Sequence, residues 1–259
     1  MASDSEKTKN QVVVEAASIV VFRDGQGAGP EILLIQRAKE LAFAGSAVVF
    51  PGGKVHASDR EIAGALSPDD ADEVAAKIAG IREIIEETGL VVGIHEQANA
   101  EQAKLAREML SEDEDLAPVL LHFGWSLDLN AMVPFARWIP TFKPGRIFDT
   151  RFYLVGLGTG NVNLTPDLGE SIRVFWSSPR DVLAMIEANE IKAIYPTRRN
   201  LERLAQFRTF DEARAHAEAS SPKIVSPWIV RAEGGDMLHI AEGIGYPITA
   251  APLTQISLD

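Results

Sequence analysis

The chain has 259 residues, of which 46% are hydrophobic and 24% are charged, so it is long enough and apolar enough to bury a sizeable core. It carries a formal net charge of −12 and contains no cysteine. The negative charge opposes general binding to nucleic acid, and the lack of thiols excludes disulfides, cysteine nucleophiles and zinc sites built on cysteine.

A short tail followed by three strands is predicted at the start of the chain. Residues 1–11 are polar and are expected to form a disordered tail. Buried strands are predicted over 12–22 (VVVEAASIVVF) and 31–37 (EILLIQR), because both runs are rich in β-branched residues and a glycine-rich loop separates them. A short third strand over 47–50 (AVVF) is expected to stop sharply at the Pro-Gly-Gly of 51–53.

A long amphipathic helix is predicted next. Ser67 is placed to cap its start, Pro68 suits its first turn, and Gly89 is expected to end it in the left-handed conformation. The residues between Gly53 and Ser67 are predicted to form a loop.

The remainder of the chain alternates helices with strands. Helices are predicted over about 96–111, 177–189 and 197–207, strands around 135–140, 148–157 and 171–176, and a hairpin within 223–247 that turns at 233–236. This mixture favours an α/β fold with a mixed sheet, an inserted helical segment and a C-terminal β-hairpin. Residues 12–259 are therefore predicted to form one domain, with insertions around 54–68 and 96–123.

No targeting signal is recognised in the first or last residues of the given sequence. The N-terminal residues lack the apolar stretch of a secretory signal, and the final ISLD does not resemble a peroxisomal signal. No apolar run is long enough to cross a bilayer. The default expectation is a cytoplasmic protein with neither nucleic-acid nor membrane partners, and a homodimer is left open.

Three carboxylates share one face of the predicted helix. At 100° per residue, Glu86 and Glu87 fall within about 60° of Glu83, and Arg82 lies beside Glu86. Like charges at this spacing repel, and a hard cation such as Mg²⁺ or Mn²⁺ relieves the repulsion. The same ions grip pyrophosphate oxygens and lower the pKa of bound water. If these glutamates were considered alone, a solvated acidic helix face would be the simpler interpretation. The surrounding sequence therefore decides between a solvated face and a metal site.

Residues 82–90 (REIIEETGL) resemble the core of the Nudix box, R-E-apolar-x-E-E-x-G-apolar, at every fixed position. In that family a strand and a Gly-Gly precede the box, and FPGG at 50–53 has this form. The family also has an acidic residue six positions after the second glycine, where Asp59 stands. Residues 60–81 separate this acid from Arg82, against seven residues in the family pattern, so the role of Asp59 stays open.

The resemblance implies a Nudix-type α/β/α sandwich and a metal-dependent hydrolase. Such an enzyme cleaves a phosphoanhydride bond in a small molecule, a nucleoside diphosphate linked to another moiety, with Mg²⁺ or Mn²⁺ as cofactor. It implies that Glu83, Glu86 and Glu87 are metal ligands, and Arg82 would hold one glutamate in its working rotamer. Nudix enzymes often place a glutamate near the metals from the region of Glu170, which is therefore a candidate general base.

The substrate is indicated by further resemblance. The long box, FPGG and residues 146–155 (RIFDTRFYLV) together resemble the coenzyme A diphosphatase branch of the family. A coenzyme A signature of the wider family is matched in part, because its inner arginine and glycine fall at Ala42 and Ser46. Coenzyme A or acyl-coenzyme A is the favoured substrate.

Two other functions remain open. One is an ADP-ribose or dinucleotide pyrophosphatase, and the other is a non-catalytic nucleotide sensor, against which the three retained glutamates argue. In each case Arg37 and Lys54, together with Gly52 and Gly53 at the entrance of the box, are the candidate substrate-binding residues.

Overall fold

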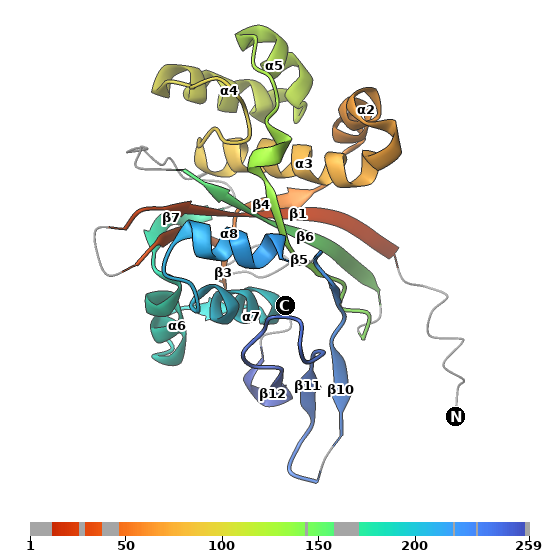
Figure 1. Ribbon diagram of the computed structural model, residues 1–259, viewed down its shortest axis with the longest axis vertical. Helices are drawn as coiled ribbons and strands as arrows, with labels where there is room; N and C mark the ends of the chain where they lie inside the picture. Colours follow the sequence, from red (N-terminus) through yellow and green to blue (C-terminus); the bar gives the residue numbers. More distant parts are fainter. Residues whose placement is uncertain are drawn as a thin grey trace.

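The structure is a computed structural model that describes residues 12–25, 29–37, 47–142, 145–157, 171–219, 221–231 and 233–256 (Figure 1). The predicted tail over 1–11 and the candidate base Glu170 lie outside these residues. None of the described helices is long and apolar enough to cross a membrane.

A mixed sheet forms the centre of the protein. Its described strands follow the order β8-β3-β2-β1-β6-β5-β9, with β4 also paired to β1 and β7 also paired to β2. The long strands β1 and β6 run parallel along their whole length. The strands are β1 Val12–Arg23, β2 Glu31–Arg37, β3 Ala47–Val49, β4 Gly52–Lys54, β5 Val133–Trp138, β6 Arg146–Gly156, β7 Ser171–Ser177, β8 Lys192–Ala193 and β9 Ile224–Val225.

Helices cover both faces of this sheet, which confirms the predicted α/β/α sandwich. Figure 1 shows α2 to α5 on one face and α6 to α8 on the other. The helices are α2 Ala57–Leu66, α3 Ala71–Thr88, α4 Ala100–Asp113, α5 Leu116–Phe123, α6 Pro179–Glu187, α7 Tyr195–Leu204 and α8 Phe210–Glu218. Short 3₁₀ turns lie at Pro68–Asp70, Leu129–Ala131 and Leu253–Gln255.

The alternation of side chains along β1 divides the core into two parts. Ala17, Ile19 and Val21 pack into the cluster under α3, whereas Val20 and Phe22 pack into the cluster under α7. Successive side chains of a strand point to opposite faces, so one buried strand supplies both cores. This explains why the run reads as continuously apolar in the sequence.

The helix that carries the carboxylates lies directly on β1. Ile78, Ile81 and Ile85 of α3 are fully buried, and a Cβ at Gly80 would lie 2.4 Å from Cδ1 of Ile19. This glycine therefore lets the helix approach the sheet closely. Gly89 ends the helix at φ 70° and donates its N–H to the Ile85 carbonyl, as predicted.

Two details of the predicted entrance to this helix were wrong. The predicted loop before Ser67 contains α2, at whose start the Asp59 carboxylate accepts the main-chain N–H of His56, and which buries Ala63 completely. The Ser67 side chain makes no capping hydrogen bond, because the 3₁₀ turn at Pro68–Asp70 intervenes before α3 starts.

The Pro-Gly-Gly segment also does more than end a strand. Gly52–Lys54 forms β4, which pairs antiparallel with β1 opposite Ala16 to Ser18. Here a Cβ at Gly52 would lie only 2.1 Å from the Ala17 carbonyl oxygen, so only glycine allows this approach.

The predicted C-terminal hairpin is confirmed and extended. Strands β10 (Trp228–Val230) and β11 (Met237–His239) form it, and β12 (Ala250–Pro252) adds a third antiparallel strand. Figure 1 shows this small sheet projecting beyond α7. The third strand and the helices α5 and α8 were not predicted.

The contrast between two glycines provides a stability test. Gly52→Ala forces a methyl group against the β1 backbone, so the free energy of unfolding should fall by about 2–3 kcal/mol. Gly64→Ala in α2 is the matched control, because its Cβ would meet nothing within 4 Å. That variant should be stabilised by roughly 0.5–1 kcal/mol through helix propensity. Urea unfolding of both variants measures this, and equal midpoints would contradict the close approach of β4 to β1.

Candidate active site

The candidate site is built around the guanidinium of Arg82, which is fully buried. Its Nε and Nη2 each donate to a carboxylate oxygen of Asp59 at 3.2 Å, and Nη2 also donates to the Lys54 carbonyl at 2.8 Å. Its Nη1 lies 3.0 Å from Oε1 of Glu83 and 3.2 Å from Oε1 of Glu86. All five N–H donors of a guanidinium are accounted for by this set of partners.

Asp59 is the part of this arrangement that the sequence left open. Its carboxylate is fully buried and faces Arg82 from the first turn of α2, where it also accepts the main-chain N–H of His56 at 2.8 Å. The inserted residues after it fold as α2 and the 3₁₀ turn, which return the chain to α3. The long spacing therefore does not remove Asp59 from the site.

Gly52 and Gly53 of β4, here called the glycine loop, pack directly on the side of α3 that carries Glu83, Glu86 and Glu87, here called the carboxylate face. The N–H of Gly52 donates to Oε2 of Glu87 at 2.8 Å. A Cβ at Gly53 would lie 2.1 Å from Oε1 of Glu83, so a side chain there would displace this carboxylate. The two glycines thus bring backbone directly against Glu83 and Glu87.

The negative charge of the carboxylate face exceeds the positive charge of Arg82 beside it. Burial raises the pKa of Glu86 to about 7; Arg82 opposes this shift and Glu83 adds to it. Burial disfavours the charged form of Arg82, but Glu83, Asp59 and Glu86 outweigh it and raise the pKa of the guanidinium. The last turn of α3 contains no basic residue, although the negative end of the helix dipole lies there. More negative charge is gathered here than Arg82 alone neutralises.

A divalent cation fits this donor set by its chemistry. Carboxylate oxygens are the ligands that Mg²⁺ and Mn²⁺ prefer, and Glu83, Glu86 and Glu87 project from one side of α3. Within the described ranges, no three acidic or histidine side chains form a complete cation site. Glu83 and Glu86 are directed at Arg82, and Glu87 at Gly52.

The side chains of the predicted substrate-binding residues Lys54 and Arg37 lie farther from the centre of the site at Arg82. The Lys54 side chain is exposed next to the glycine loop. Arg37 is partly exposed at the end of β2, and its Nε is buried without a hydrogen-bond partner in the described part of the chain. No described contact joins Arg37 to Arg82. His56, which the sequence analysis did not select, lies at the rim with its Nδ1 3.6 Å from Glu114.

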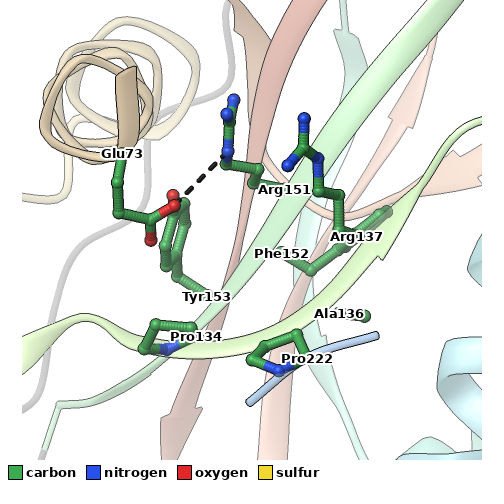
Figure 2. A pocket seen from close by; sticks show the side chains of 8 residues that line it. All are labelled: Glu73, Pro134, Ala136, Arg137, Arg151, Phe152, Tyr153 and Pro222. Carbon is green, nitrogen blue, oxygen red and sulfur yellow. Dashed lines mark ion pairs between the residues drawn. The ribbon is translucent and has the colours of Figure 1, made fainter. Parts of the chain in front are cut away.

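Figure 2 shows a different hollow, of about 260 Å³, over β5 and β6. One wall is Glu73 in the first turn of α3, ten residues before Glu83 and therefore roughly 15 Å away along the helix. Arg151 pairs there with Glu73 at 3.3 Å, and Arg137 pairs with Asp149 at 2.6 Å. Glu73, Arg137 and Arg151 of this hollow are therefore already in ion pairs. The hollow also lies apart from the carboxylate face.

Comparisons with known proteins agree with this geometry. No family model matches the chain. The acyl-coenzyme A diphosphatase NUDT19 of Gallus gallus is 28% identical over 262 residues, which is 76% of this chain and 69% of the relative. Its Homo sapiens counterpart is 23% identical over 83% of this chain and 72% of its own length. A solved Nudix hydrolase from Alicyclobacillus acidocaldarius has a TM-score of 0.68 and 26% identity, covering 79% of this chain and 96% of that one.

The sandwich, the helix with the Nudix-box residues and these relatives define the class that the chain resembles: it is similar to the Nudix hydrolases in fold and in sequence. Among these hydrolases, its sequence is similar to relatives that are named acyl-coenzyme A diphosphatases.

The buried pair between Asp59 and Arg82 predicts a large loss of stability when it is broken. Asp59→Asn leaves the guanidinium buried with less negative charge around it, so the free energy of unfolding should fall by about 3 kcal/mol. Asp72→Asn is the control, because Asp72 is exposed and pairs with Arg60 on the surface; it should change stability by less than about 1 kcal/mol. Chemical denaturation measures the free energy of unfolding of both variants. Equal losses in the two variants would show that the fold does not require the buried pair.

Proposed function

We propose that the chain is a metal-dependent diphosphatase that hydrolyses coenzyme A or acyl-coenzyme A. The observation that carries the proposal is the pairing of Glu83 and Glu86 with the buried Arg82, beside Glu87, which accepts the N–H of Gly52. The substrate class is supported by the two NUDT19 relatives, which are named acyl-coenzyme A diphosphatases.

The three glutamates would hold Mg²⁺ or Mn²⁺. When bound, the cation would neutralise charge on the diphosphate and supply an acidified water molecule. Arg82 would keep Glu83 and Glu86 on the same side of the helix, and Asp59 would keep Arg82 in place. Burial around Glu86, together with its raised pKa, makes this carboxylate a group whose charge a cation would stabilise.

Substrate phosphates would approach over the glycine loop. Because neither Gly52 nor Gly53 carries a side chain, the backbone of β4 lies directly against Glu83 and Glu87, and it would meet the phosphates beside these glutamates. The exposed ammonium of Lys54 lies beside this loop and would pair with a phosphate, and Arg37 is a further candidate for the same role.

The proposed reaction adds one water molecule across the diphosphate. The P–O–P linkage breaks, and the products are 3′-phosphoadenosine 5′-phosphate and a 4′-phosphopantetheine, with the acyl group retained when acyl-coenzyme A is the substrate. Glu170, which lies outside the described residues, remains the candidate general base for activating this water.

Removal of divalent cations should abolish this hydrolysis. The purified protein in EDTA should show no turnover of coenzyme A, and Mg²⁺ or Mn²⁺ should restore it, because the carboxylate face cannot neutralise phosphate charge by itself. Chromatography of the products, with ADP-ribose and a dinucleotide as parallel substrates, measures both activity and preference. Full activity without metal would contradict the assignment, and preference for ADP-ribose would move the substrate to the other diphosphatase class.

Substitution of the glutamates should separate activity from stability. Glu87→Gln removes one charge from a crowded face and keeps an oxygen that can accept the Gly52 N–H, so its free energy of unfolding should be at least that of the wild type. Glu86→Gln also relieves repulsion but weakens one of the three carboxylate contacts of Arg82, so its free energy of unfolding should change less than that of Asp59→Asn, in which the fully buried carboxylate is altered. Loss of cation affinity should lower kcat/KM at least about a hundredfold. Glu61→Gln, on the exposed side of α2, is a control with the same chemical change and should keep full activity. Near-native turnover by both site variants would show that these carboxylates are not needed for catalysis.

A further inference from the structure

The glutamates of α3 lie at an unfavourable place in the helix. All three fall within its last two turns, where unpaired carbonyls make the helix end negative. Arg82 is directed toward the side chains, so it does not meet these carbonyls. Compensation at the main chain must come from elsewhere in the fold.

Arg107 of α4 supplies it. Its Nε donates to the main-chain carbonyl of Glu86 at 2.8 Å, although the two residues are 21 positions apart. The side chain also passes over the end of α3, since a Cβ at Gly89 would lie 3.9 Å from Cδ of Arg107. A cation at the C-terminal end of a helix that also bonds a terminal carbonyl stabilises that end.

The helix that carries Arg107 is fixed independently. Ala106 and Leu110 of α4 are fully buried in the core cluster shared with α3. At its other end Asn99 and Gln102 form a reciprocal capping box. Arg107 is half-buried, and the buried Ala106 and Leu110 beside it hold this part of α4 against the core.

We propose that Arg107 is a positioning residue for the carboxylate face. By binding the Glu86 carbonyl, it fixes the last turn of α3, and through that turn it fixes the side chains of Glu86 and Glu87. The predicted insertion around 96–123, which includes α4 and α5, thereby becomes part of the catalytic apparatus without touching the substrate. The proposal rests on the proposed function of these glutamates.

Two substitutions separate positioning from packing. Arg107→Met keeps an apolar stem but removes the charge and the donors. Arg107→Lys keeps a charge and one donor that can reach a carbonyl. Lys104→Met is the control on the same helix, because Lys104 is exposed and pairs only within α4, with Glu108 at 3.8 Å, among its described ion pairs.

Each full-length variant is assayed for Mn²⁺ affinity by calorimetry without substrate, for kcat and KM with coenzyme A, and for melting temperature. Arg107→Met should weaken Mn²⁺ binding and lower kcat by about tenfold each, with a smaller change in KM. Arg107→Lys should recover most of both losses, and the control should match the wild type. Melting temperatures should stay within a few degrees of one another.

Wild-type Mn²⁺ affinity and kcat in Arg107→Met would overturn the proposal. A loss that Arg107→Lys does not relieve, accompanied by an equal fall in melting temperature, would overturn it as well and assign Arg107 to packing. If the wild type binds Mn²⁺ but leaves coenzyme A intact, the substrate assignment fails, while the Mn²⁺ affinities still decide the role of Arg107.

Discussion

The site depends on one buried cation, the guanidinium of Arg82. Burial of a charge is unfavourable unless partners surround it, and here Asp59 and the Lys54 carbonyl meet one side while Glu83 and Glu86 meet the other. A flexible lysine could not satisfy this geometry, because the planar fork sets several bonds at once. The same contacts that stabilise Arg82 therefore hold two of the three box glutamates together.

Around this cation, elements from distant parts of the chain converge on the end of α3. β4 brings its glycine backbone against Glu83 and Glu87, α2 brings Asp59 behind Arg82, and α4 brings Arg107 to the Glu86 carbonyl. The Gly52 N–H and the Arg107 guanidinium compensate the negative charge of this helix end, whereas Asp59 compensates the buried charge of Arg82. Burial, reinforced by Glu83, raises the pKa of Glu86, and a divalent cation would stabilise the charged form of this carboxylate.

Local patterns in the sequence were sufficient to predict part of this arrangement. The spacing of the glutamates lies within one helix, whose geometry is fixed, and Gly89 marks its end by a left-handed conformation that favours glycine. The long strands were predictable for a similar reason, because β1 and β2 are runs of β-branched and other apolar residues that are buried on both faces.

Features that depend on tertiary contacts were missed. Asp59 meets Arg82 across 23 positions, and only the path of α2 reveals the contact. β4 is made of two glycines and a lysine, which have little preference for strands, so its pairing with β1 has no local signal. β12 is equally short and contains Pro252, and the bond from Arg107 joins two separate helices.

The central claim is that Glu83 and Glu86, which Arg82 holds together, form a site for a divalent cation with Glu87, which Gly52 binds. The most direct measurement is anomalous X-ray scattering from crystals of the protein soaked in Mn²⁺. The account predicts an anomalous peak bounded by these three carboxylates and the glycine loop. Crystals saturated with Mn²⁺ that show no peak there, or a peak only in the hollow beside Glu73 and Arg151, would contradict it.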